Sequence, residues 1–578
     1  MKRWGKYIKP YLKYFIAGPL CMVVEVIGEV LMPTFLALII NAWHAGTLTP
    51  ASSIGYAALM VVTAIMMMLG GVGGSYFGAK ASVNFAADLR SDLYAKVQNF
   101  SFANIDKFST GSLVTRLTND VTQMQNMVNM CLRMLLRSPG MLIGGLIMAI
   151  RLNPSLSLVL AVTIPMMLLS IGLIILRGFS FFGKVQDRID NLNSTVQESI
   201  TNVRVVKSFV REDYEIKKFD AANTGLKEIG MKAMNTMIFM QPVISFFMYA
   251  SSLSVILLGG NTVLAGEMPV GDLSSFVTYV NQIMFSLMMV TFMLMMMSRA
   301  MASAKRIREV LDEECDITDI YATYPEKQVT EGSVEFRGVS FRYYKNSEEK
   351  VLNSIDLKIL PGQTVGIIGS TGCGKTTLVS MIPRLYDTDE GSVLVDGVDV
   401  RDYSLFNLRE GVGMVLQKNV LFSGSIEDNL RWGNEDATDE ELKYFADKAQ
   451  AHKFIESFSD GYASQLDQGG TNVSGGQKQR LCIARTLLKR PKILILDDST
   501  SAVDTATEAM IRKAFAEDLS DSTKIIIAQR ISSVQNADMI VVMDDGCITG
   551  VGTHMELLET NEAYQEIYES QMGKRGEA

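Results

Sequence analysis

The chain has 578 residues, which is long enough for two or three domains. Hydrophobic residues make up 48% of it and charged residues 20%, a mixture that indicates a membrane region joined to an ordinary water-soluble domain. The net charge of −8 gives no electrostatic reason to expect a nucleic acid as a partner. Its six cysteines lie far apart without metal-ligand spacing, which favours free thiols in a reducing compartment.

The amino-terminal half contains six long apolar stretches, at residues 14–43, 52–79, 131–150, 155–176, 233–265 and 273–298. A helix needs about 20 residues to cross about 30 Å of hydrocarbon, so each stretch is long enough to span a bilayer. Four of the six carry no charged residue, which is unusual for the core of a water-soluble protein. We therefore expect six transmembrane helices.

The links between these stretches predict the topology. The links after the second and fourth stretches run for about fifty residues and are rich in Lys and Arg, as is the amino-terminal segment, whereas the other three links are short and nearly free of them. By the positive-inside rule, both termini and both long links are cytoplasmic. The long links also have an amphipathic helical pattern, so helices 2 to 5 are expected to continue well beyond the bilayer.

The pattern changes after about residue 305. We expect a transmembrane domain at 1–305, a polar linker at 306–330 and a third region at 331–578. The third region alternates short β-rich runs, such as 365–368 and 493–496, with helical stretches, which indicates an α/β domain with a largely parallel sheet. The expected fold is thus an all-α six-helix transmembrane domain followed by an α/β domain, and a GxxxxGK[ST] motif at Gly369–Thr376 makes the latter an expected P-loop nucleotide-binding domain.

A phosphate-binding loop follows the run at 365–368. The segment from Gly369 to Thr376 fits GxxxxGK[ST] between a strand and a helical stretch. Glycines let backbone N–H groups close around phosphates, Lys375 would reach the β- and γ-phosphates of ATP, and the Thr376 hydroxyl would ligate Mg²⁺. The residues expected to bind the nucleotide here are Gly369, Ser370, Thr371, Gly372, Cys373, Gly374, Lys375, Thr376 and Thr377.

A second apolar run ends in two carboxylates, Asp497 and Asp498. Asp497 stands where the Walker B aspartate of a P-loop protein would hold Mg²⁺, directly or through water. The alternative is a buried strand that meets a solvated acidic turn.

The segment Val473-Ser474-Gly475-Gly476-Gln477 resembles the signature motif of ATP-binding cassette (ABC) transporters, with Val473 where Leu is usual. The resemblance covers nearly the whole chain and implies further nucleotide contacts. Gln417 resembles the Q-loop glutamine, which also approaches the metal, Asp504 the D-loop aspartate and Tyr343 the aromatic residue that stacks on adenine. A tyrosine of the strand core, with Tyr344 as a rival for the stacking role, is the alternative for Tyr343. The signature residues Ser474, Gly475, Gly476 and Gln477 would face the γ-phosphate held by another chain.

The resemblance to exporter-type members implies an assembly of two such chains. Each ATP would lie between one chain's phosphate loop and the other chain's signature motif. Short coupling helices, expected near residues 98–103 and 201–208, would rest on the nucleotide domains.

Two positions depart from the family pattern. Asp498 stands where a catalytic glutamate is usual, and Gln529 stands where a switch histidine is usual. The Asp498 carboxylate is one methylene shorter than a glutamate's, and Gln529 cannot carry a positive charge. Together they resemble the degenerate site of bacterial heterodimeric multidrug exporters, in which the partner subunit supplies the competent residues. We therefore expect a heterodimer in which this chain's own site hydrolyses ATP poorly.

Charged residues within the apolar stretches suggest a function or a pairing. Glu25 and Glu29 are four residues apart on the first helix and either favour cationic substrates in a cavity or pair with an arginine or a polar neighbour. Arg133 and Arg137, with the same spacing where the third helix enters the membrane, are expected to reach the inner headgroups. On the sixth helix Met284, Met288, Phe292 and Met295 form a stripe that suits varied apolar ligands, or that packs against lipid or core.

The leading interpretation is an export pump for hydrophobic or amphipathic compounds in the cytoplasmic membrane of a bacterium, driven by ATP with Mg²⁺. A lipid or peptide exporter with the same architecture, and a regulatory or channel-like protein gated by ATP, are the alternatives. A channel is disfavoured because the chain has no long regulatory insert and its apolar stretches are uninterrupted.

Overall fold

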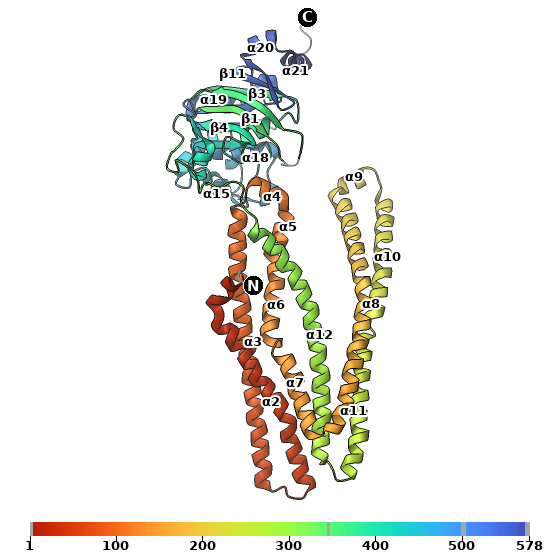
Figure 1. Ribbon diagram of the computed structural model, residues 1–578. Coiled ribbons are helices and arrows are strands. Elements are labelled where there is room, and N and C mark those ends of the chain that lie inside the picture. The colour runs from red at the N-terminus through yellow and green to blue at the C-terminus, as the bar shows by residue number, and fades with distance from the viewer. Residues whose placement is uncertain (1–3, 344–346, 499–504, 573–578) are drawn as a thin grey trace. The chain divides into compact units, whose positions relative to one another are not determined.

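The computed structural model describes residues 4–343, 347–498 and 505–572. The chain forms two compact units (Figure 1). The membrane unit comprises Met1–Val97 with Gly111–Asp312, and the nucleotide unit comprises Gln98–Thr110 with Glu313–Ala578. A short segment of the amino-terminal half therefore belongs to the second unit.

The membrane unit is entirely helical in its described part. Its helices are α1 (Gly5–Ile8), α2 (Leu12–His44), α3 (Pro50–Gln98), α5 (Thr110–Thr115), α6 (Val121–Met134), α7 (Arg137–Leu152), α8 (Pro154–Thr201), α9 (Val203–Ser208), α10 (Glu212–Met237), α11 (Met240–Leu264) and α12 (Val270–Asp312). Six helical segments are long and apolar enough to cross a membrane, as the sequence predicts: Gly5–His44, Pro50–Gln98, Thr110–Leu152, Pro154–Thr201, Glu212–Leu264 and Val270–Met293.

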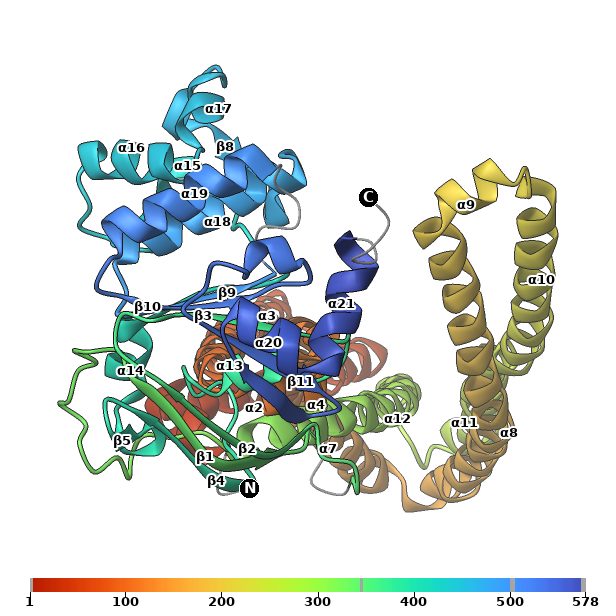
Figure 2. The ribbon, with the colours of Figure 1, turned by 90° about the horizontal axis from the view of Figure 1, so that it is seen from above.

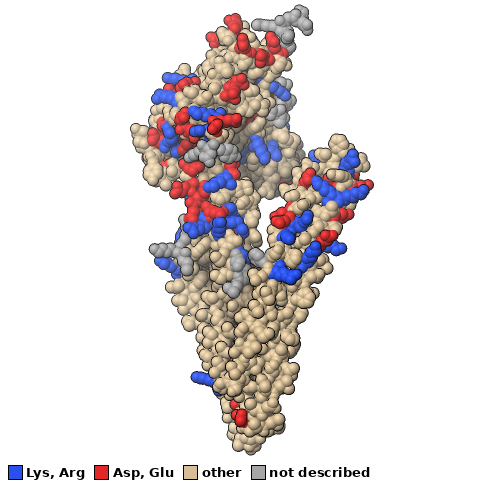
Figure 3. All heavy atoms as spheres, turned by 45° about the vertical axis from the view of Figure 1, so that its right-hand side comes forward, with Lys and Arg blue, Asp and Glu red and all other residues tan. Residues whose placement is uncertain are grey.

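The prediction that helices extend past the bilayer is confirmed. The 49 residues of α3 and the 48 residues of α8, at about 1.5 Å each, give lengths of about 70 Å, more than twice the hydrocarbon thickness of about 30 Å. The sixth helix, α12, also continues to Asp312, beyond the expected boundary at residue 305. On the face drawn in Figure 3, charged side chains are nearly absent from the lower part of the bundle and gather at one end of its helices.

Glycines of α3 allow close approach to α2. A Cβ at Gly70 would lie 2.8 Å from the carbonyl oxygen of Cys21, and one at Gly71 would lie 3.3 Å from Glu25 Oε2. Because a side chain at either position would push the helices apart, these glycines place the Glu25 carboxylate directly against the α3 backbone.

The helices α8 and α10 lie side by side, with α9 at their tip (Figure 1). Within the membrane unit this tip stands away from α3 and α6 in both ribbon views (Figures 1 and 2). Val205, Phe209 and Val210 are exposed there, with 73% of Phe209 accessible. The short helix expected near residues 201–208 is thus present, as α9.

The nucleotide unit is built on three sheets. Their strands are β1 (Val334–Phe341), β2 (Leu352–Ile359), β3 (Thr364–Gly369), β4 (Glu390–Val395), β5 (Val398–Asp399), β6 (Val412–Val415), β7 (Gly424–Ser425), β8 (Gln465–Leu466), β9 (Ile493–Asp497), β10 (Thr523–Ile527), β11 (Met539–Asp544) and β12 (Cys547–Gly552). The largest sheet has the order β12-β11-β3-β10-β9-β6, in which only β12 is antiparallel to its neighbour. The expected α/β class with a largely parallel sheet is confirmed.

Helices cover this sheet unevenly. They are α13 (Lys375–Ser380), α14 (Leu405–Gly411), α15 (Ile426–Arg431), α16 (Asp439–Lys448), α17 (His452–Glu456), α18 (Gly475–Lys489), α19 (Thr505–Asp518), α20 (His554–Thr560) and α21 (Glu562–Met572). Figure 2 shows α15 to α19 on one side of the large sheet and β1, β2 and β4 on the other. The core of the sheet is apolar throughout, with Ile495 and Ile525 fully buried.

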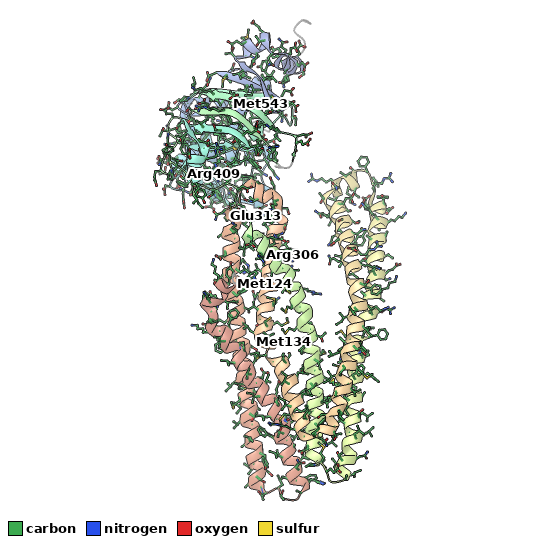
Figure 4. All side chains as sticks on the ribbon, in the orientation of Figure 1. Met124, Met134, Arg306, Glu313, Arg409 and Met543 are labelled. Carbon is green, nitrogen blue, oxygen red and sulfur yellow. The ribbon has the colours of Figure 1, made fainter. Side chains whose placement is uncertain are left out.

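The first of the two expected short helices lies slightly later than expected. It is α4 (Phe102–Phe108), whereas the sequence suggested residues 98–103. The shift follows from capping, because Ser101 and Asn104 form a reciprocal capping box that fixes the helix start. Within the nucleotide unit Lys107 Nζ pairs with Glu313 at 2.8 Å, and the Phe102 ring lies 5.9 Å from that of Tyr386. Figure 4 labels Glu313 beside α4.

Candidate functional site

Four parallel strands end at one edge of the large sheet. The strands β3, β10, β9 and β6 are neighbours in that order, so the loops that follow them lie side by side. The phosphate loop follows β3, Gln529 follows β10, Asp497 ends β9 and Gln417 follows β6. The carboxyl ends of parallel strands are the usual position of ligand sites in such sheets. The fold therefore gathers residues that are up to 160 positions apart in the sequence.

The phosphate loop depends on its glycines. Gly369 has φ 157° and Gly374 has φ 95°, and a Cβ at Gly369 would lie 2.0 Å from the carbonyl oxygen of Met543, a residue labelled in Figure 4. Only glycine is tolerated at such a position. Lys375 folds back over the loop, where its Nζ donates to the carbonyl oxygens of Gly369 at 2.9 Å and of Ser370 at 2.6 Å. The loop thus has the backbone and the cation that a polyphosphate requires.

The two proposed magnesium ligands are in contact. Thr376 Oγ1 donates a hydrogen bond of 3.0 Å to Asp497 Oδ1. Burial raises the pKa of Asp497 above the ordinary range, and the neighbouring Asp498 carboxylate raises it further against the hydrogen bond from Thr376. An uncompensated buried carboxylate beside a hydroxyl fits a hard divalent cation, which prefers oxygen ligands. Thr376 and Asp497 would hold Mg²⁺ together with phosphate oxygens and water, since this ion is usually bound through one or two carboxylates and keeps several waters.

Asp498 is held by two side-chain amides. Gln529 Nε2 donates to Asp498 Oδ2 at 2.8 Å, and Gln417 also hydrogen-bonds this carboxylate. Burial raises the pKa of Asp498, although the bond from Gln417 opposes the shift. Asp498 has φ 46°, in the left-handed region, where aspartate is one of the better tolerated residues. The two side chains that depart from the family pattern, Asp498 and Gln529, are therefore hydrogen-bonded to each other.

Tyr343 lies close to the phosphate loop. Its hydroxyl is 2.8 Å from Thr377 Oγ1, and its ring makes edge contacts with Phe341 and Tyr386 at centroid distances of 5.0 and 5.3 Å. The side chain is still 43% exposed. An exposed aromatic face beside the loop fits stacking on a base, which remains the prediction for this residue. Tyr344 lies outside the described residues.

The signature segment forms the amino-terminal end of α18. Ser474 and Gln477 form a capping box, with Gln477 N donating to Ser474 Oγ at 3.3 Å. Gly475 is exposed, and a Cβ there would meet open space. The free N–H groups and dipole of this helix end are therefore accessible to an anion from outside. Asp504 of the expected D-loop lies outside the described residues.

Gln571, which no sequence pattern singles out, holds the Gln529 loop. Gln571 of α21 donates from Nε2 to the Gln529 carbonyl oxygen at 2.7 Å and accepts from the N–H of Ile531 at 2.9 Å. No motif marks it, since it lies more than 40 positions downstream on a different element. His554, one of the three histidines of the chain, is hydrogen-bonded to the Tyr564 hydroxyl at 2.7 Å.

Comparisons with known proteins agree with this geometry. Residues 15–287 match the ABC transporter transmembrane region model, and residues 352–501 match the ABC transporter model. The chain is 36% identical over 586 aligned positions to the Uncharacterized ABC transporter ATP-binding protein YfiB of Bacillus subtilis, covering 100% of this chain and 99% of that protein. The chain belongs to the ABC transporter family.

Other relatives of this ABC transporter align along nearly their whole length. This chain is 37% identical over 570 positions to the Uncharacterized ABC transporter ATP-binding protein Rv1273c of Mycobacterium tuberculosis, covering 98% of this chain and 97% of that protein. It is 32% identical over 588 positions to the Putative multidrug export ATP-binding/permease protein YgaD of Bacillus subtilis, covering 98% of each. The protein is therefore a multi-pass membrane ABC transporter of exporter-type, half-transporter architecture, which binds ATP and uses it to drive transport.

In the membrane unit of the ABC transporter, Glu25 and Glu29 are paired with an arginine. Arg137 Nη2 lies 3.2 Å from Glu25 Oε1 and 2.8 Å from Glu29 Oε1. The expectation that Arg137 reaches the headgroups is therefore wrong, because two carboxylates hold its guanidinium inside the bundle. The i, i+4 spacing on α2 is what lets both carboxylates reach one partner.

The residues of the predicted Met and Phe stripe on α12 lie in different environments. Met284 is fully buried in the apolar core of the unit, and Met288 packs against that core. Phe292 is 47% exposed and lines a cavity that Glu25 also lines. The Met295 side chain lies outside the described residues. Packing therefore accounts for Met284, while substrate contact stays a prediction for Phe292.

Proposed function

We propose that this ABC transporter is one half of a heterodimeric exporter of hydrophobic or amphipathic compounds, and that its own ATP site binds ATP but hydrolyses it slowly. One observation carries the proposal. The phosphate loop, Thr376 and Asp497 have the contacts that ATP and Mg²⁺ need, whereas the two positions that carry hydrolysis hold Asp498 and Gln529, hydrogen-bonded to each other at 2.8 Å.

The chemistry of these two side chains explains why hydrolysis would be slow. The Asp498 carboxylate is one methylene shorter than glutamate and accepts hydrogen bonds from two amides, which lowers its availability as a general base toward water. A misplacement of about 1 Å costs about 10²-fold in rate. Gln529 is neutral and offers no imidazolium charge to the γ-phosphate. ATP binding is retained because it depends on the phosphate loop, Thr376 and Asp497.

Two surfaces support a second, different half-transporter as the partner. The exposed amino-terminal end of α18, with open space at Gly475, is available to complete an ATP site on another chain. The α9 tip exposes Val205 and Phe209 beside the basic Arg204 and Lys207, and an apolar patch of this kind on a helical tip indicates a protein contact. A partner with glutamate and histidine at the two altered positions would supply the competent site.

The substrate class is proposed from a relative's description and from the cavities of the membrane unit. The relative YgaD carries a multidrug export description, and the membrane unit encloses cavities lined by Met and Phe side chains. Flexible thioether side chains suit ligands of varied shape. The Lys and Arg content of the amino-terminal segment and of the two long links supports a topology with both termini and the nucleotide unit in the cytoplasm of a bacterium. The outward direction of transport is proposed from the exporter-type architecture.

The proposal is tested with the chain purified alone and with its partner. The lone chain should bind ATP and show at most about a hundredth of the hydrolysis rate of the complex. ATP-dependent uphill accumulation of an apolar dye into inside-out vesicles should require both chains. A lone chain that hydrolyses ATP as fast as the complex would overturn the heterodimer, and downhill flux without accumulation would overturn the pump.

A further inference from the structure

A charged cluster in the membrane unit has a net negative charge. Glu25 and Glu29 share a single nitrogen, Nη2, of Arg137. Two carboxylates against one guanidinium leave one negative charge without a partner in the cluster. Arg137 donates from Nη2 to Glu29 Oε1 at 2.8 Å, and among the described residues its Nε has no hydrogen-bond partner. The cluster of Glu25, Glu29 and Arg137 thus lacks one positive charge.

The same region contains buried polar atoms without a hydrogen-bond partner. Among the described residues these include Glu29 Oε2, Gln282 Oε1 and Arg137 Nε. Two of the three are acceptors. Buried polar atoms are nearly always satisfied in folded proteins, so two unsatisfied acceptors beside one net charge call for a donor that the chain does not supply.

Two cavities meet at this cluster. One, of about 450 Å³, is lined by Glu25, Asn129 and Arg133, and the other, of about 410 Å³, by Glu29, Gln282 and Ser138. Arg137 and Met134 line both, and Figure 4 shows Met134 within the helical bundle. The remaining walls are largely apolar, with Met22, Met130 and Phe292 in the first cavity and Met141, Met248 and Phe285 in the second.

The cluster lies inside the hydrocarbon. Arg137 begins α7 and Leu152 ends it at the outer side, so fifteen residue steps at about 1.5 Å place Arg137 about 22 Å from that end, within a core of about 30 Å. An unpaired charge at such a depth is costly, and a ligand that neutralises it gains correspondingly.

Arg133 does not neutralise the carboxylates. Its Cγ lies 3.5 Å from the Cβ that Gly78 would carry, whereas Glu25 faces Gly71. Seven residues of α3 separate these two glycines, which corresponds to about 10 Å along the helix. Arg133 makes no ion pair with any residue that the structure describes, and it lies nearer the cytoplasmic end.

We propose that this cluster is a binding site for amphipathic primary amines, a substrate class that rests on the export function proposed above. The ammonium group lies against Glu29 and Glu25 and supplies the missing positive charge. Its N–H donors match the acceptors Glu29 Oε2 and Gln282 Oε1, which lie close together because Gln282 Nε2 donates to the Glu29 carbonyl oxygen at 3.1 Å. The apolar body of the amine lies along the Met and Phe walls. The negative charge selects the ammonium group, and the flexible walls accept apolar bodies of different shapes.

The test uses dansylcadaverine, a primary amine with an apolar fluorophore, and its N-acetyl derivative, which has the same fluorophore but no charge. Saturable binding to the full chain in lipid nanodiscs is measured without ATP, with empty nanodiscs as the blank. The amine should bind at least about tenfold more tightly than the acetylated probe. Equal affinity of the two probes on the unmodified protein would overturn the proposal without any variant.

Variants then locate the site. Glu29→Gln and Glu25→Gln should each weaken amine binding by about tenfold or more and leave binding of the acetylated probe unchanged. Glu267→Gln, which removes an exposed carboxylate from the turn before α12, should change neither. Glu29→Asp, which keeps the charge, should retain most of the amine preference and guards against a loss caused by misfolding. Amine preference that survives both glutamine substitutions would overturn the assignment.

Because amine binding is measured without nucleotide, the experiment can reject the proposed substrate class without rejecting the export function, and the reverse. Loss of amine selectivity with intact vesicle accumulation of other compounds would reject the amine site alone. Amine binding without ATP-dependent accumulation would reject the export function and leave the site standing.

Discussion

Gln529 Nε2 donates a 2.8 Å hydrogen bond to Asp498 Oδ2, and this bond links the ends of two adjacent strands. The pairing of β10 with β9 places Ile527 opposite Asp497, so the residues that follow are brought together by the sheet. The amide occupies an oxygen of the carboxylate that would otherwise be free to accept a proton from water. The two altered positions therefore form one interacting unit.

Restoring both positions should recover hydrolysis that neither recovers alone. Asp498→Glu and Gln529→His should each give at most a small gain, because both groups act on one transition state, whereas the double variant should exceed the product of the single gains by about tenfold. The measurement is ATP hydrolysis in a complex whose partner's catalytic glutamate has been removed. Asp460→Glu, an extension of an exposed carboxylate in a turn, is the control. No gain in the double variant would show that other residues set the defect.

Two substitutions should separate the sites across the dimer. Lys375→Ala should weaken ATP binding at this chain's loop by about tenfold or more, since it removes the cation at the phosphates, and should leave hydrolysis at the partner site. Gly475→Asp should nearly abolish hydrolysis, because it places a carboxylate where the other chain's γ-phosphate would lie.

The stability of the Gly475→Asp variant should be unchanged, since an acidic residue favours a helix amino terminus and Gly475 borders open space. Gly183→Asp adds the same charge at another exposed glycine, which has no positive φ and borders open space, and serves as control. Equal losses of hydrolysis from Lys375→Ala and Gly475→Asp would argue against the assignment of sites.

Removal of the Gln571 side chain should loosen the Gln529 loop. Gln571→Ala leaves the buried N–H of Ile531 without its acceptor, which should cost about 1–3 kcal/mol of unfolding free energy and reduce ATP affinity. Chemical denaturation and nucleotide titration measure the two effects. Gln565→Ala is a matched control, because Gln565 lies on the same helix and bonds only the Leu558 carbonyl oxygen at 2.7 Å. Comparable ATP affinities of the two variants would contradict a role of Gln571 in holding the loop.

Tyr386 should connect α4 with the base of the nucleotide. Its ring lies 5.9 Å from Phe102 of α4 and 5.3 Å from Tyr343. Tyr386→Leu keeps apolar volume but removes both ring contacts, so it should weaken ATP binding by about threefold and reduce substrate stimulation of hydrolysis in the complex. Tyr444→Leu, at an exposed tyrosine of α16, is the control. Unchanged affinity and stimulation in Tyr386→Leu would show that the aromatic contacts are only structural.

Local patterns predicted most of the elements. Six apolar stretches predicted the spanning helices, because each is long enough to cross the hydrocarbon of a bilayer and few cores of water-soluble proteins contain such long apolar runs. The glycine-rich loop after a strand predicted the phosphate site. The position of α4 was less well predicted, at 98–103 instead of Phe102–Phe108, since the capping pair of Ser101 and Asn104 decides the helix start and no apolar period marks it. The position of a helix end depends on local hydrogen bonds, which a hydropathy pattern does not reveal.

By itself the sequence determined the two-part architecture, the phosphate loop and the presence of Asp498 and Gln529 at unusual positions, since these depend on composition and on short, contiguous motifs. Only the tertiary structure decided which side chains meet. The order β3-β10-β9-β6 brings Gln529 onto Asp498, and the approach of α7 to α2 brings Arg137 onto Glu25 and Glu29. Such contacts join residues more than 30 or 100 positions apart, and they arise from strand order and helix packing, which no local pattern in a single sequence encodes.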